Sequence, residues 1–71
     1  MNKTELNQIN RIESTYESLK GFIELVKIAN HGKTEEQRRS AESMLYYSRN
    51  WLEGLGVSEA VLDAIENEVV A

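Results

Sequence analysis

The sequence predicts an all-α protein, built as a long antiparallel helical hairpin with a short third helix and assembled as a dimeric helical bundle. Three observations predict this class. The 71 residues contain no Pro and only four Gly, which favours long helices. Apolar residues recur at helical spacing along the chain. Glycines and capping signals divide the chain at about 5–30, 35–54 and 59–69, which we interpret as three helices of one domain over residues 1–71.

The first helix, at about 5–30, carries an apolar row with the alternating three- and four-residue steps of a coiled coil. The row consists of Ile9, Ile12, Tyr16, Leu19, Ile23 and Val26. Thr4 is the expected N-cap, and Gly32 is expected to end the helix in the left-handed conformation. Gly21, in the middle, is either a tolerated surface position or a point where another helix approaches closely.

The second helix, at about 35–54, begins with a capping box in which Thr34 and Gln37 satisfy backbone amides. Its core row is Ala41, Leu45, Ser48, Leu52 and Leu55, and a flanking apolar row is Met44, Tyr47 and Trp51. The opposite row, expected to face solvent, is Arg39, Glu42, Tyr46, Arg49 and Glu53. We expect Trp51 in the core, whereas Tyr46 and Tyr47 cannot both be buried by one helix face.

The third helix, at about 59–69, follows a break at Gly54 to Gly56. Ser58 is its expected N-cap, and Val57 and Leu62 have the spacing of a hydrophobic staple. The residues expected to face inward are Val61, Leu62, Ile65 and Val69.

Residues 51–65 resemble the turn of a helix-turn-helix, through the Leu-Gly-Val-Ser stretch at 55–58 followed by Leu62 and Ile65. This resemblance implies a DNA-binding transcriptional regulator that reads DNA with its third helix. The sequence departs from the pattern at Leu52, where such motifs usually have Ala. The third helix is also acidic and has no Lys or Arg, so it would repel phosphates.

The length of the first helix predicts self-association. It should extend about 39 Å and the second helix about 30 Å, so that about two turns at its start lack an intrachain partner. A chain of this size without disulfides also gains only about 3–5 kcal/mol from one core. We expect a homodimer whose interface consists of Leu6, Ile9, Ile12, Tyr16 and Leu19.

The formal net charge of −4 lies entirely in residues 54–71, because acidic and basic residues balance before that segment. This acidic segment is either a solvated helix face or a patch that meets a partner with a basic surface. The candidate partner-binding residues are Tyr46, Tyr47, Trp51, Glu59, Asp63 and Glu66.

Catalysis, cofactors and metal sites are not expected, because the chain has no Cys, a single His and no Gly-rich phosphate loop. Glu24 is the one candidate general acid, and we expect it instead to face solvent and pair with Lys20 and Lys27. His31 is interpreted as a residue of the helix end. The absence of a secretory signal and of a transmembrane segment favours the cytoplasm.

The function expected from these observations is non-catalytic binding of another protein, as a small regulator, inhibitor or adaptor. An acidic protein this small and without cysteine is typical of bacteria and their phages. Two alternatives stay open, a helix-turn-helix-like DNA-binding regulator and a structural subunit of a larger assembly.

Overall fold

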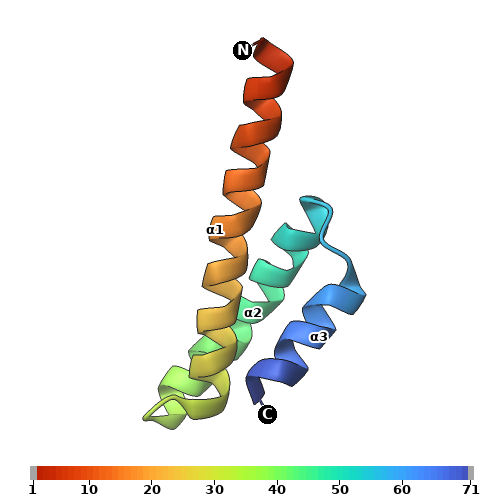
Figure 1. Cartoon of the computed structure of the whole chain (residues 1–71). Coiled ribbons are helices and arrows are strands. Elements are labelled where there is room, and N and C mark those ends of the chain that lie inside the picture. Colours follow the sequence, from red (N-terminus) through yellow and green to blue (C-terminus); the bar gives the residue numbers. More distant parts are fainter. Residues whose placement is uncertain (1, 71) are drawn as a thin grey trace.

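The computed structural model describes residues 2–70, and the regular structure within them is helical throughout. The helices are α1 (Lys3–His31), α2 (Glu35–Gly54) and α3 (Glu59–Val70). Figure 1 shows the chain turning back after α1, so that α2 and α3 lie beside its C-terminal half while its N-terminal half projects beyond both. The all-α class is therefore confirmed.

The N-terminus of α1 differs from the prediction. Asn2, and not Thr4, is the N-cap, because its side-chain Oδ1 accepts a hydrogen bond of 2.8 Å from the amide of Glu5. Asn is at least as good a cap as Thr, since its short side chain reaches the amides of the first turn. The helix consequently begins at Lys3, and Thr4 lies in its first turn.

Gly32 ends α1, but its conformation is not the left-handed one that we expected. Its φ and ψ are −59° and 146°, which any residue can adopt. Space explains the glycine, because a Cβ at this position would lie 2.6 Å from the carbonyl oxygen of Ile28. The Gly32 carbonyl also accepts a hydrogen bond of 2.8 Å from the guanidinium of Arg38, which joins the turn to α2.

The predicted cap of α2 is confirmed in its main feature. Thr34 Oγ1 accepts a hydrogen bond of 3.1 Å from the amide of Gln37. The Gln37 side chain reaches back as expected, but its Oε1 accepts from the amide of Lys33, at 3.2 Å, one residue before the cap. Side chains thus satisfy one amide of the first turn of α2 and one amide just before the cap.

The left-handed glycine is Gly56, in the turn between α2 and α3, where φ is +100°. Its amide donates to the carbonyl of Glu53 and the amide of Val57 donates to that of Leu52, each at 3.0 Å. This is the pairing of a Schellman motif, which closes a helix when the residue after the C-cap has positive φ. Gly56 is thus required by backbone conformation.

Gly56→Ala is expected to lower the free energy of unfolding by about 1–2 kcal/mol, because a Cβ is strained at positive φ. Urea unfolding followed by circular dichroism measures the change. Gly54→Ala is the matched control, since Gly54 is helical and has nothing within 4 Å of an added Cβ. It should be neutral or stabilising, and equal losses in the two variants would contradict this assignment.

α3 begins as the sequence predicts. Ser58 Oγ accepts a hydrogen bond of 3.3 Å from the amide of Val61, which satisfies one amide of the first turn. Val57, just before the cap, is half-buried against the core, and Leu62, in the second turn, is fully buried.

The core lies where the three helices meet, and it is small. Its fully buried side chains are Phe22, Val26, Leu52 and Leu62, and the partly buried apolar residues packed against them are Leu19, Leu45, Val57, Ile65 and Val69. Phe22 lies outside the apolar row expected to define the face of the first helix. Leu19 and Val26 of that row do reach the core, on either side of Phe22. The N-terminal part of the row lies outside the core, where α1 projects beyond α2 and α3 (Figure 1).

Candidate functional site

The N-terminal half of α1 carries an apolar stripe that no other described residue covers, which we call the α1 stripe: Leu6, Ile9, Ile12 and Tyr16. Ile12 is 69% exposed and Tyr16 is 60% exposed. Leu19, the fifth residue of the expected interface, is half-buried against the core and continues the stripe into it. The expected interface residues thus follow one another along α1, and four of the five remain accessible.

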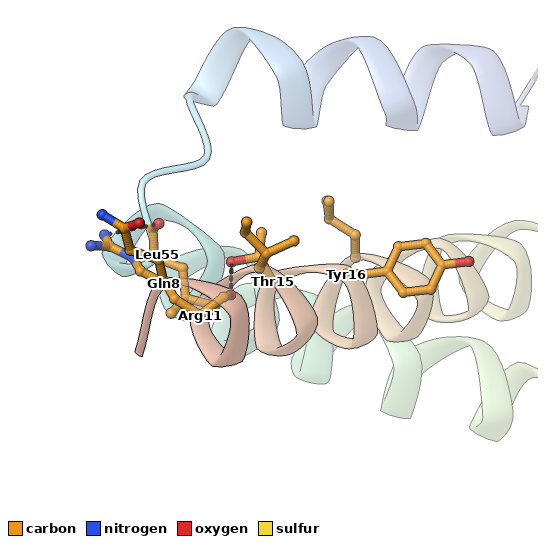
Figure 2. Close-up of a pocket in the computed structure, with 7 residues that line it drawn as sticks. Gln8, Arg11, Thr15, Tyr16 and Leu55 are labelled. Atoms are coloured by element: carbon orange, nitrogen blue, oxygen red, sulfur yellow. Dashed lines mark hydrogen bonds between the residues drawn. The ribbon is translucent and has the colours of Figure 1, made fainter. Parts of the chain in front are cut away.

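A shallow open groove of about 560 Å³ lies between this part of α1 and the end of α2. Its lining residues are Gln8, Arg11, Ile12, Thr15, Tyr16, Leu19 and Leu55. Figure 2 shows Gln8, Arg11 and Leu55 close together at one end and Tyr16 further along the helix. The α1 stripe therefore borders a groove that has apolar walls and one polar end.

The polar end of the groove is held by Arg11, whose Nη2 donates a hydrogen bond of 3.2 Å to the carbonyl oxygen of Leu55. This bond ties α1 to the turn between α2 and α3. Further along, the ammonium group of Lys20 lies 5.0 Å from the ring centroid of Tyr16, a cation–π contact that orients the ring.

Arg49 joins α2 to α3, a feature that the sequence analysis missed by assigning Arg49 to the solvated row of the second helix. Its guanidinium lies 2.5 Å from an oxygen of Asp63, 3.5 Å from Glu66 and 3.9 Å from Glu59, all on α3. It also lies 3.7 Å from Glu53 of its own helix. The Arg49 side chain is only 23% exposed, because α3 covers it.

The pKa of Arg49 is raised, chiefly by the hydrogen bond to Asp63, against a smaller lowering by burial; Asp63, Glu66 and Glu59 add to the rise through their charges. Three of the six candidate partner-binding residues, Glu59, Asp63 and Glu66, therefore face a cation of their own chain. The acidic surface of α3 is partly neutralised from within, which weakens its attraction for a basic partner.

The three candidate aromatic residues of α2 are exposed. The prediction that Trp51 lies in the core is wrong: its side chain is 62% exposed, and its Nε1 donates a hydrogen bond of 3.0 Å to Ser18 Oγ on α1. Tyr46 and Tyr47 are both exposed, with their rings in edge-to-face contact at 5.5 Å. The prediction that they cannot both be buried is confirmed.

Glu24, the one candidate general acid, is exposed and lies 3.5 Å from Lys27, as expected. Lys20 pairs instead with Glu17, at 3.4 Å. His31 lies exposed in the last turn of α1.

No group of three or more His, Cys, Asp or Glu side chains within residues 2–70 is placed to hold a metal ion. None of the helices described here combines the length and the apolar character that crossing a membrane requires.

No protein-family model, curated protein or solved structure matches the chain. The features that distinguish its surface are exposed apolar faces of helices, on α1 and on α2. Exposed apolar patches are found in general where proteins contact other proteins, membranes or ligands.

Proposed function

We propose that the protein is a small non-catalytic regulator, inhibitor or adaptor that binds another protein through helical surfaces and acts in the cytoplasm as a homodimer. The observation that supports this most strongly is the uncovered α1 stripe. An apolar row that continues from the core out along a projecting helix is covered at low cost by another helix of the same pattern.

A second copy of the chain is the partner that best suits the α1 stripe. The first 20 residues contain the basic Lys3, Arg11 and Lys20 and three glutamates, so that this half of α1 has no net charge. Two such segments meet without net repulsion, although the chain as a whole carries −4. In this proposal each protomer is a long antiparallel hairpin, and two protomers pack their α1 stripes about a twofold axis to form a dimeric bundle.

Ile12→Asp tests the proposal. Burying an unpaired carboxylate costs about 3–5 kcal/mol, so the dimer dissociation constant should rise at least about 100-fold. Sedimentation equilibrium reads the mass, and circular dichroism checks that the helices persist, which we expect because Ile12 is exposed within the protomer.

Arg39→Ala is the control for this experiment. Arg39 makes one exposed ion pair with Glu35, at 2.9 Å on the same helix, which contributes only a few tenths of a kcal/mol. The mass of the Arg39→Ala assembly in sedimentation equilibrium should match that of the wild type. A wild-type protein that is monomeric at high concentration, or an Ile12→Asp variant that dimerises normally, would show that the α1 stripe is not the interface.

A DNA-binding regulator is the second candidate, favoured by the resemblance of residues 51–65 to a helix-turn-helix. Against it, α3, the helix that would enter the major groove of DNA, carries Glu59, Asp63 and Glu66 around Arg49. DNA phosphates would therefore meet carboxylates, which repel them. A gel-retardation assay with duplex DNA over a range of salt concentrations separates the candidates. Binding that weakens steeply with salt would favour DNA, and we expect none.

A further inference from the structure

One side of the α1–α2 pair is open along its length. We call it the α1–α2 face and define it by Leu25, Ile28, Met44, Tyr47 and Trp51. Leu25, Ile28 and Met44 line one shallow depression between the two helices. Trp51 lines a second depression, further along the pair, with Ser14 and Ser18 of α1. Met44, Tyr47 and Trp51 follow one another by three and four residues, so they project from the same side of α2.

α3 lies on the other side of this pair. Val26 of α1 and Leu45 of α2 line a depression together with Glu66 of α3. Arg49, which contacts Asp63 of α3, is five residues beyond Met44 and two before Trp51. At 3.6 residues per turn, these offsets place Arg49 more than a quarter of a helical turn away from both side chains. The α1–α2 pair thus has one side covered by α3, while no described element covers the other.

The one Trp of the α1–α2 face needs no hydrogen-bond partner from outside the chain. The indole N–H of Trp51 is already bonded to Ser18, so covering the ring does not strand a donor. Gly21, between Ser18 and Leu25 on α1, has nothing within 4 Å of an added Cβ. A backbone from outside the chain can therefore approach α1 closely there, which is the second interpretation that the sequence left open for this glycine.

The charges around the α1–α2 face are mostly negative. Glu13 and Glu17 line the depression beside Trp51, and Glu36 lines the one beside Met44. Lys33 is the one Lys or Arg that lines either depression in the described chain. Glu17 is paired with Lys20 at 3.4 Å, whereas Glu13 and Glu36 have no ion pair among the described residues. These two carboxylates favour a partner with cationic flanks.

We propose that the α1–α2 face binds one amphipathic helix of a protein partner, with an apolar stripe and basic flanks. This inference rests on the proposed protein-binding function and names the class of partner. The depression that contains Met44 reaches back to Gln37. From Gln37 to Trp51 is about 21 Å along α2, which is the length of a helix of about four turns. The bound helix lies on the side opposite α3 and completes a four-helix bundle.

Trp51 provides the measurement, because it is the only Trp in the chain. The probe is a synthetic Trp-free helical peptide of leucine and lysine, with leucines at three- and four-residue steps. Its binding should shift the emission of Trp51 to shorter wavelength in a saturable titration. A leucine and glutamate peptide of the same pattern should give no shift, because the carboxylates around the α1–α2 face repel its glutamates.

Three variants locate the binding. The double variant Met44→Ala/Tyr47→Ala should weaken binding at least about tenfold, whereas Val61→Ala, at an exposed apolar position on α3, should leave it unchanged. Gly21→Gln should also weaken binding at least about tenfold while raising helix stability, so a loss of binding cannot be attributed to unfolding. Equal affinity of the double variant and the wild type would overturn the proposal.

Charge is tested with two variants of equal net charge, Glu13→Gln beside Trp51 and Glu68→Gln on α3. The first should weaken peptide binding several-fold and the second should not, whereas equal effects would mean attraction to the whole molecule. Sedimentation of the same samples reports self-association separately. A peptide that dissociates the dimer without shifting the Trp51 emission would overturn this proposal and place the peptide on the α1 stripe.

Discussion

Phe22→Ala is expected to leave most of the protein unfolded in dilute buffer at room temperature. Phe22 is 0% exposed and lies in the buried cluster with Val26, Leu52 and Leu62. Truncating a buried Phe to Ala costs about 3–5 kcal/mol, which includes the cavity left behind. A single core of this size supplies about the same net amount, so the loss removes the margin of stability. Circular dichroism and a urea titration measure the folded fraction.

Tyr46→Ala is the control for this prediction, since it truncates an aromatic side chain that is exposed. Its free energy of unfolding should stay within about 0.5 kcal/mol of the wild-type value. Both variants should be compared with the wild type at one protein concentration, because association contributes to apparent stability. If Phe22→Ala melts like the wild type, the core does not lie where the three helices meet.

Arg49→Ala is expected to lower the free energy of unfolding by about 1–2 kcal/mol, which exceeds the effect of a typical surface ion pair. The variant loses a short charge-assisted hydrogen bond to Asp63 and the ion pairs to Glu59 and Glu66. It also leaves those carboxylates to repel one another along α3. Urea unfolding at low and high salt measures the loss, which should shrink as salt screens the charges.

Arg39→Ala is again the matched control, with an expected loss below about 0.5 kcal/mol. The pH dependence of the contribution of Arg49 to the free energy of unfolding follows from its raised pKa, because folding favours the charged form of the guanidinium. Its contribution is complete at neutral pH and is lost only when the pH rises through that raised pKa. The difference between wild type and Arg49→Ala should therefore stay constant from about pH 7 to pH 10. A difference that disappears within this range would contradict a role for the guanidinium.

The helices and most of their ends could be predicted because the signals are local. Apolar spacing, glycines and capping signals predicted the three helical segments. Thr34 and Gln37 cap α2 and Ser58 caps α3, through hydrogen bonds that span a single turn. The errors at the ends are also local. Asn2 and Thr4 are both good caps only two residues apart. Gly32 and Gly56 both follow helices, and which of them adopts positive φ depends on the direction in which the chain leaves the helix.

The surfaces were harder to predict, because periodicity shows which residues share a face but not which element covers that face. Arg49 and Asp63 are 14 positions apart in sequence and meet only because α3 lies on that side of α2. Trp51 is turned toward the other side, so it is exposed although its spacing allowed a place in the core. The α1 stripe was predicted because it depends on helix length, which the sequence does determine.

The projecting end of α1 has a consequence for local unfolding. Isolated helices shorter than about 12–15 residues are marginal in water, and within residues 2–70 no hydrogen bond or ion pair joins the turns of α1 before Arg11 to α2 or α3. In a lone protomer the backbone amides of these turns should exchange with deuterated solvent quickly, whereas those around Phe22 should exchange only through global opening. Slow exchange along the first turns would mean that another molecule lies over them. The exchange rate of each amide in these turns therefore shows which part of the N-terminal end of α1 is covered.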